Sequence, residues 1–407
     1  MSVKEKLSKF VKRMGGPGHL YSRHSVKATK QYQIANPDVA LWLNRSLFYY
    51  PRLRLDIPGG FVHAAPQGID PRLVSRITSA YRLAMDHFKG AGDSVWSGFS
   101  ERSRQIHDSL LEGDERITQI LEDPIPTTLF DGYYSVVRDI GLDEYSHEAR
   151  KLREWTVHQV FEGFVRLAQA TGTTRLWNPE RTLPEPDGEV SITPASLENL
   201  LAKLDGEIGV RIDFPNPIQR EFGLPTTRGI ASYRAPHAIY QAWRIRELLR
   251  ETSAARVLEI GAGMGRTAYY ARRIGITDFT IVDLPLANVA QANFLGRVLG
   301  PEAIWVPGDP VSEQAGRIRI CPPAWLANTD KEFDVVLNVD SITEMDAQHA
   351  SNYVHEISRR AAIFLSINHE ANSFTVRDLL AERRIKTRTL RYTYWLRKGY
   401  VEERFFF

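Results

Sequence analysis

The stretch VLEIGAGMG, Val257–Gly265, decides the fold of this chain. A short apolar run leads into three glycines, and a helix-forming segment follows. Glycines at such a turn let the backbone bend tightly and let a ligand approach main-chain N–H groups closely. Asp283 closes the next apolar run, 18 positions after Gly265, where a carboxylate can accept both ribose hydroxyls of an adenosine. The stretch therefore predicts a Rossmann-like site for a ligand that contains adenosine.

The spacing within this stretch separates two classes of nucleotide site. The dinucleotide fingerprint needs a small residue at position 266, but Arg266 stands there and the third glycine comes one residue early. Glu259 lies inside the strand, as in the methyltransferase pattern E/D-x-G-x-G-x-G, where the acidic residue holds the loop and the methionine amino group. We therefore expect S-adenosylmethionine as cofactor and not NAD, bound by Glu259, Gly261, Gly263, Gly265 and Asp283.

The segments around the glycine stretch alternate between strand-like and helix-like patterns. The expected strands are VLEI, FTIVD, AIWV, VVLNV and AIFLSI, which indicates an α/β fold with a buried parallel sheet. The C-terminal TRTLRYTYWLR and YVEERFFF, separated by Lys398-Gly399, predict two antiparallel strands. A parallel sheet with such a C-terminal hairpin is the arrangement of class I methyltransferases. Ordinary dinucleotide-binding domains lack the hairpin.

The N-terminal half lacks the alternation of strand-like and helix-like segments, so we expect two domains. Residues 1–209 are predicted to form a mainly helical domain that binds the acceptor or drives oligomerisation, and residues 210–407 the methyltransferase domain. Helical spacing is visible over residues 71–122 and 144–171, and Ser196 is expected to cap a short helix. IGVRIDFP alternates like a strand that ends at Pro215.

Composition excludes several classes of protein. The net charge is only +3, which gives no concentrated basic face for nucleic acid. Cys321 is the only cysteine, so neither an internal disulfide nor a cysteine-based metal cluster is possible. No apolar run is long enough to cross a bilayer. Residues 1–14 form a basic amphipathic pattern, interpreted as a docked or frayed helix, with contact at the inner membrane face as the alternative. We expect a cytoplasmic protein.

Two further polar residues follow expected strands. Asp309 comes after AIWV and is a candidate contact for the adenine amino group, with a turn aspartate as the equal alternative. Asn338 ends VVLN, at the sheet edge where ligands gather in open parallel sheets. We count both residues as candidates for cofactor binding.

The segment FDVVLNVDSITEM, residues 333–345, resembles the fourth-strand region of a bacterial family of sugar O-methyltransferases that is associated with surface polysaccharide and glycolipid synthesis. FLSINHEAN and the helix that carries His237 are also similar to that family, and the resemblance covers about residues 210–407. It implies an acceptor hydroxyl on a sugar or glycoconjugate. The substrate class rests on N-x-x-S-x-x-E-M alone, because the glycine loop is common to many methyltransferases.

An alcohol is a poor nucleophile, so a positioned base assists methyl transfer. Asp340, Glu344, His369 and Glu370 follow the fourth and fifth strands, beside the expected methyl group. We favour His369 first, because a histidine is partly neutral near pH 7, and Asp340 second. Glu344 is expected to cap or support the loop. His237 and Tyr240 are expected to pack in the core, with the cofactor entrance as the alternative. Nothing in the spacing requires a metal.

Other acceptors and other functions stay open. The chain has no N/D-P-P-Y tetrapeptide for adenine methylation, and Cys321-Pro322 reverses the order that cytosine methylation uses. A small natural-product hydroxyl is the second acceptor class. A non-catalytic scaffold that has the methyltransferase fold is the third hypothesis, and a homo-oligomer is compatible with all three.

Overall fold

The computed structural model describes residues 52–62, 68–88, 101–113, 115–129, 147–176, 189–250 and 255–407. The basic segment 1–14 therefore lies outside the described residues, and its predicted role is untested. No helix in the described ranges has the length and apolar character needed to span a membrane.

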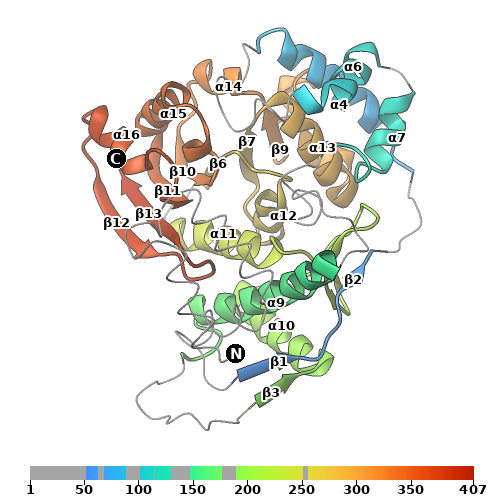
Figure 1. Cartoon of the computed structure of the whole chain (residues 1–407). Coiled ribbons are helices and arrows are strands. Elements are labelled where there is room, and N and C mark those ends of the chain that lie inside the picture. The colour runs from blue at the N-terminus through green and yellow to red at the C-terminus, as the bar shows by residue number, and fades with distance from the viewer. Residues whose placement is uncertain are drawn as a thin grey trace.

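An eight-stranded sheet forms the centre of the C-terminal half (Figure 1). Its spatial order is β12-β13-β11-β10-β6-β7-β9-β8, and the neighbours from β11 to β8 are parallel. The strands are β6 (Arg256–Ile260), β7 (Asp278–Val282), β8 (Ile304–Trp305), β9 (Ile318–Cys321), β10 (Phe333–Val339), β11 (Ala361–His369), β12 (Arg388–Thr393) and β13 (Tyr400–Phe406).

Successive strand residues point to opposite faces of this sheet. Helices cover both faces. Val257 and Val335 belong to a cluster with α11 (Ala235–Leu248), α12 (Arg266–Arg273) and α13 (Pro285–Leu299). Their neighbours Leu258 and Val336 belong to a second cluster, with α14 (Pro323–Ala327), α15 (Ala347–Arg360) and α16 (Val376–Glu382). The single-turn helices are η2 (Pro301–Ala303), η3 (Val311–Glu313) and η4 (Ile342–Glu344).

The predicted C-terminal hairpin is confirmed. β13 pairs antiparallel with both β12 and β11, and it lies between them. Gly399 has φ +85°, a conformation that a glycine adopts without strain in the connection before Tyr400. The predicted α/β fold with the class I methyltransferase arrangement is therefore present in the topology of the sheet itself.

The predicted third strand is only partly right. AIWV contributes the two-residue strand β8, which lies at the sheet edge and pairs with β9. The neighbour of β7 is instead β9, IRIC, which the sequence analysis missed. β9 is four residues long and contains Arg319, so its alternation is short and broken by a buried charge.

The N-terminal helices pack onto the sheet's helices. α4 (Pro71–Met85) lies on α13, where a Cβ on Gly296 would come within 2.8 Å of Leu73. α6 (Arg104–Glu112) and α7 (Arg116–Glu122) pack against α4. α9 (His147–Ala170) lies beside α11 at the other end of the molecule, with α10 (Pro194–Ile208) (Figure 1).

Two small sheets complete the described fold. β1 (Arg52–Leu55) pairs with β3 (Glu189–Ile192), and β2 (Gly60–Phe61) pairs with β4 (Phe222–Thr226), which pairs with β5 (Gly229–Ala231). The strand predicted before Pro215 was wrong: residues 211–217 have no regular structure. Ser196 is the third residue of α10, and Thr193 is the N-cap, since their side chains form a reciprocal capping box.

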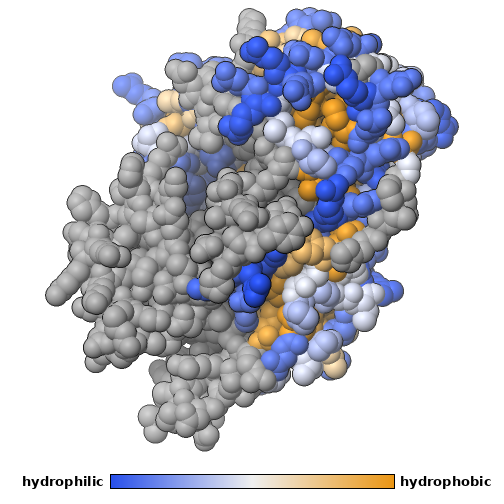
Figure 2. Space-filling model, turned by 45° about the vertical axis from the view of Figure 1, so that its right-hand side comes forward, coloured by the Kyte–Doolittle hydropathy of each residue, from blue (hydrophilic) through white to orange (hydrophobic). Residues whose placement is uncertain are grey.

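One hydrophobic cluster joins the two predicted domains. It contains Leu73 and Phe164 together with Phe279 and Leu365, so no gap in packing follows residue 209. The division into a helical domain, residues 1–209, and a methyltransferase domain, residues 210–407, stays a prediction. Figure 2 shows hydrophilic side chains over much of the described surface on that side, with smaller hydrophobic patches between them.

Candidate functional site

The glycine loop joins β6 to α12 as a strand–turn–helix, as predicted. Gly261, Gly263 and Gly265 have φ of +74°, +56° and +81°, which favours glycine at each position. The N–H of Gly261 donates to the carbonyl of Val282 at 3.0 Å, so the loop starts in contact with the end of β7. A Cβ on Gly261 would overlap the side chain of Ser341. The loop is therefore closely packed on its sheet side.

Glu259 is a buried carboxyl group directly below this loop. Glu259 is 3 % exposed, and its Oε2 has no hydrogen-bond partner in the described part of the chain. Burial raises the pKa of Glu259 to about 8, while a hydrogen bond from Thr267 opposes that rise. A buried acceptor without a donor is costly, so this oxygen is suited to a donor that the ligand supplies.

Asp283 follows β7 and is held in one orientation. Its carboxylate accepts from the N–H of Leu284 at 2.8 Å and from Nε2 of Gln291 at 2.7 Å. Burial raises the pKa of Asp283 to about 6, and the N–H groups of Ala262 and Gly263 act against that rise. The carboxylate of Asp283 therefore lies against the main chain of the glycine loop.

Gln291 links Asp283 to the glycine loop and was not among the residues predicted from the sequence. It is fully buried on α13, and its Nε2 also donates to the carbonyl of Gly263 at 3.1 Å. It thereby connects Asp283 to the loop directly. The available signal was a glutamine on an otherwise apolar helix, PLANVAQANFLGRVL, since a buried amide requires partners.

Asn338 supports the glycine loop from β10. It is fully buried, and its Nδ2 donates to the carbonyl of Ile260 at 2.9 Å and to Oγ of Ser341. Ser341 donates to the same carbonyl at 3.0 Å. The two polar residues of N-x-x-S thus fix the end of β6 to the end of β10. A direct contact of Asn338 with the cofactor stays a prediction.

A buried polar network continues from Asn338 to β11. Asn368 donates to Oδ1 of Asn338 at 3.3 Å and to Oγ of Ser366 at 2.8 Å. Thr343 donates to Oδ1 of Asn368 at 3.3 Å and accepts from Asn372 at 3.0 Å. The network orders the two strand ends at which the predicted catalytic residues lie.

Asp340 has the most unusual geometry at this edge. Its φ of +63° is in the left-handed region, which costs a non-glycine residue free energy. Its Oδ2 accepts from the hydroxyl of Tyr400 at 2.9 Å and pairs with Arg397 at 3.4 Å. Its Oδ1 is buried and has no hydrogen-bond partner among the described residues. One carboxylate oxygen is therefore fixed, and the other is left for a further donor.

The other candidate bases are placed differently. Nδ1 of His369 accepts from the N–H of Ala371 at 3.2 Å, so the neutral ring carries its proton on Nε2. The ring lies edge-on to Tyr400, with centroids 5.4 Å apart. The side chain of Glu370 is 40 % exposed and pairs with Arg391 at 2.7 Å. Glu344 ends η4, and the cap of α15 is Asp346.

Asp309 lies beyond β8 and is occupied by α4. Arg76 donates to its two oxygens, at 2.9 Å and 2.5 Å, and also to the carbonyls of Pro301 and Ile304. Asp309 further accepts from the N–H of Val306 at 3.0 Å. This is the turn aspartate of the alternative interpretation. Its predicted contact with adenine has no support from the geometry.

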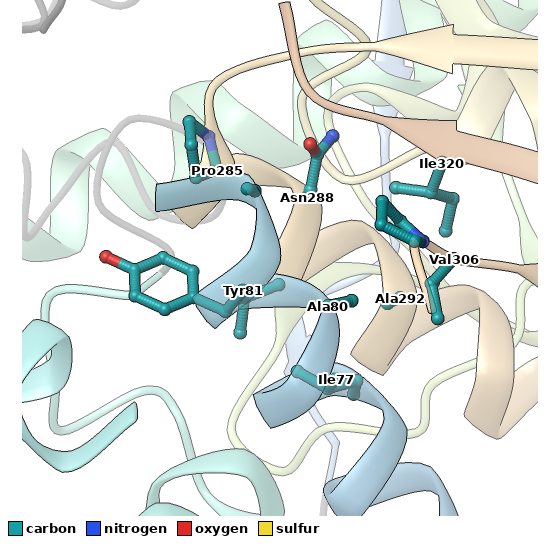
Figure 3. Close-up of a pocket in the computed structure, with 11 residues that line it drawn as sticks. Ile77, Ala80, Tyr81, Pro285, Asn288, Ala292, Val306 and Ile320 are labelled. Carbon is teal, nitrogen blue, oxygen red and sulfur yellow. The ribbon is translucent and has the colours of Figure 1, made fainter. Parts of the chain in front are cut away.

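A small hydrophobic pocket lies between α4 and α13 beside this ion pair (Figure 3). Figure 3 shows Ile77 and Ala80 on α4 opposite Asn288 and Ala292 on α13, with Val306 and Ile320 from the sheet side. Tyr81 and Asn288 are the lining residues with polar side-chain atoms. The pocket shows that α4 covers the sheet beyond β7 without filling the space completely.

His237 and Tyr240 both lie on α11, in a cluster of aromatic residues. Nδ1 of His237 is 3.1 Å from the hydroxyl of Tyr394, and burial together with nearby Arg397 lowers the pKa of His237 to about 3. His237 is therefore neutral near pH 7. Tyr240 is buried and donates to Glu402, as its expected core position requires.

The described residues contain no group of three or more histidine, cysteine, aspartate or glutamate side chains arranged to hold a metal ion. The polar groups gather instead in two neighbouring sets. The first is the glycine loop with Glu259 and Asp283, and the second is Asp340 with Tyr400 and Arg397. The arrangement suits a ligand at the loop and a proton acceptor beside it.

Comparisons with known proteins give structural likeness alone. No family model and no curated protein matches the sequence. An amino pentose methyltransferase from Micromonospora echinaspora is 13 % identical, with a TM-score of 0.32, over 42 % of this chain and 91 % of that one. Magnesium protoporphyrin IX methyltransferase from Synechocystis is 12 % identical, with a TM-score of 0.30, over 42 % and 80 %. The class I methyltransferase fold rests on the sheet topology described above.

Proposed function

We propose that this chain is an S-adenosylmethionine-dependent O-methyltransferase that acts on a sugar hydroxyl of a glycoconjugate or polysaccharide precursor. The observation that carries the proposal is the pairing of two sets of groups at one sheet edge. A glycine loop is fixed to Asp283 through Gln291, and Asp340 beside it presents one unpartnered oxygen within the described residues. The resemblance of N-x-x-S-x-x-E-M supports the sugar acceptor.

The loop region has the groups that this cofactor requires. Asp283 can accept from ribose hydroxyls, and Gly261, Gly263 and Gly265 admit a ligand close to the backbone. The buried Oε2 of Glu259, unpartnered among the described residues, suits the ammonium group of a methionine moiety. S-adenosylmethionine supplies an electrophilic methyl group on a sulfonium, with a neutral thioether as the leaving group.

Asp340 is the residue we assign as general base. The acceptor oxygen forms the new bond to the methyl carbon as the carbon–sulfur bond breaks, and the hydroxyl proton passes to Oδ1 of Asp340. Tyr400 and Arg397 hold Oδ2, so the carboxylate stays oriented during the step. We prefer Asp340 to His369 as the base. The Nδ1 lone pair of His369 accepts the N–H of Ala371, and Nε2 carries the ring proton, so the neutral ring has no free lone pair.

The other predicted cofactor residues receive supporting roles in this proposal. Asn338 fixes the glycine loop from β10, and Asp309 fastens α4 to the sheet. Neither has to touch the cofactor for the site to work. The alternative acceptor, a small natural-product hydroxyl, would use the same loop and the same base.

Methyl transfer from radiolabelled S-adenosylmethionine to a panel of methyl glycosides and phenols tests the proposal. We expect transfer to glycosides and little transfer to phenols. Preference for the phenols would replace the sugar acceptor by the natural-product class. Cofactor binding without transfer to any member of the panel would favour the scaffold hypothesis.

A further inference from the structure

A continuous row of side chains connects α9 to Asp340. Each neighbouring pair is in ring contact or within a short cation–ring distance, although the members come from three separate segments. We call this set the aromatic row. Trp155 stacks on Tyr233 with centroids 6.3 Å apart, Tyr233 lies 5.9 Å from the guanidinium carbon of Arg397, and Arg397 lies 4.1 Å above the Tyr400 ring. The row consists of Trp155, Tyr233, Arg397 and Tyr400.

The two ends of the row carry buried polar atoms without partners. At the α9 end, Nε1 of Trp155, a residue only 8 % exposed, has no hydrogen-bond partner in the described residues. At the other end, the same holds for Oδ1 of Asp340. Buried polar groups are nearly always paired, so each unpaired one calls for an explanation. A donor at one end and an acceptor at the other suit a ligand with several hydroxyl groups.

An unpartnered indole N–H does not by itself mark a ligand. Trp243 on α11 is also buried, and its Nε1 has no partner in the described ranges either. Trp243 packs on Tyr240 and under Arg244 and makes no ring contact with Trp155 or Tyr233 that the structure records. What distinguishes Trp155 is its position in the row that ends at Asp340.

Close contacts hold α9 against this row. A Cβ on Gly163 would come within 2.5 Å of Pro236, so α9 approaches the start of α11 as closely as a glycine permits. Arg166 donates to the carbonyl of Trp395 at 3.3 Å, and Trp395 donates to Gln169 at 3.2 Å. α9 and the hairpin loop are thus fixed to each other. Trp155 therefore has a defined position relative to Asp340.

We propose that the aromatic row is the acceptor site, and that it takes a glycoside of at least two rings. This proposal rests on the proposed function. The ring with the reacting hydroxyl lies at Asp340, and the second ring lies along the row toward α9 and accepts a hydrogen bond from Nε1 of Trp155. Aromatic faces and N–H donors are groups that bind polyhydroxylated rings.

This assigns a specificity role to the N-terminal helical segment. Trp155 does not touch the reacting atoms, so it acts on acceptor choice. Loss of its N–H leaves a sugar oxygen unpaired and weakens binding of the second ring by about 10- to 100-fold. The preference for a disaccharide over a monosaccharide should therefore depend on Trp155.

The test compares methyl α-D-glucopyranoside with methyl β-maltoside as acceptors, in the wild type, Trp155→Phe and Trp243→Phe. Trp155→Phe keeps an aromatic ring and removes only the indole N–H and part of the ring. We expect the wild type to have a higher kcat/KM for the maltoside, and Trp155→Phe to lose most of that preference. Trp243→Phe, the matched control, should retain the wild-type ratio. Equal ratios in all three proteins would overturn the proposal.

A binding measurement separates this inference from the proposed function. Saturation-transfer NMR with S-adenosylhomocysteine present should show contact with both rings of the maltoside in the wild type. In Trp155→Phe, saturation of the second ring should decrease while that of the first persists. Failure of the wild type to bind the maltoside, or an identical pattern in both proteins, would contradict the acceptor site. Binding with no methyl transfer would contradict only the proposed function.

Discussion

The glycine loop and the Asp340 region lie at the same sheet edge but satisfy their polar groups in different ways. At the loop, Asp283, Gln291 and Asn338 are paired with nearby main-chain groups, and the buried Oε2 of Glu259 is left without a partner among the described residues. At Asp340, one oxygen has no partner within the described residues, and its neighbours come from the hairpin. The difference indicates a rigid cofactor platform beside a site whose last partner is the acceptor.

The largest expected effect is the loss of turnover when the basic group of Asp340 is removed. Asp340→Asn keeps the size of the side chain and removes its basicity, so turnover should fall by about 100- to 10,000-fold. The affinity for S-adenosylhomocysteine should stay within about twofold of wild type. Steady-state kinetics and calorimetry measure the two quantities separately. Turnover within about threefold of wild type would exclude Asp340 as the base.

A substitution in the glycine loop should have the opposite signature. Gly261→Ala introduces a Cβ that overlaps Ser341, at φ +74°, and should weaken cofactor binding by about tenfold or more. Gly275→Ala is the matched control, since Gly275 has φ +94° and no described atom lies within 4 Å of its added Cβ. Both variants carry backbone strain, but only Gly261→Ala should lose affinity in calorimetry. Equal losses would show that strain alone is responsible.

Glu259 gives the loop region a pH dependence. Its pKa in the folded state is raised to about 8, so its contribution to stability is present below about pH 4.5 and is lost as pH rises through 8. Without cofactor, the unfolding free energy of wild type should fall between pH 6.5 and 8.5 by on the order of 1–2 kcal/mol.

Asp283 has its raised pKa near 6, so most of its titration is complete before this window opens. Glu259→Gln should remove most of the slope and bind S-adenosylhomocysteine more weakly. Urea unfolding at the two pH values measures the effect. The same slope in both proteins would mean that Glu259 titrates normally.

The ion pair between α4 and the turn after β8 should matter for stability alone. Arg76→Ala leaves Asp309 and two carbonyls without their donor, at a cost of about 1–3 kcal/mol in unfolding free energy. Asp309→Asn should cost less, and both variants should keep cofactor affinity. A tenfold loss of affinity in Asp309→Asn with normal stability would restore the adenine contact that its sequence position suggests.

The smallest expected effect concerns His369. Its Nδ1 already accepts a backbone N–H, so His369→Ala should lower turnover by less than about tenfold and leave the pH profile unchanged. A loss of about 100-fold, together with loss of an inflection near pH 6.5, would return the role of base to His369.

The sequence predicted what local patterns determine. The glycine loop, Asp283 and the hairpin follow from spacings within short segments, so they could be recognised without coordinates. The strand β9 was missed because four residues with a buried arginine give no clear alternation. The partners of Asp340 and Asp309 were not predictable, since Tyr400 is 60 positions and Arg76 is 233 positions away in the chain.

We expect the loop region to bind S-adenosylmethionine and the Asp340 region to contribute nothing to that affinity. Calorimetric titration of S-adenosylhomocysteine into wild type, Asp283→Ala and Asp340→Asn tests it most directly. We predict equal affinity in wild type and Asp340→Asn, and about 10- to 100-fold weaker binding in Asp283→Ala, which leaves ribose hydroxyls underpaired. No binding to wild type, or unchanged affinity in Asp283→Ala, would contradict the account.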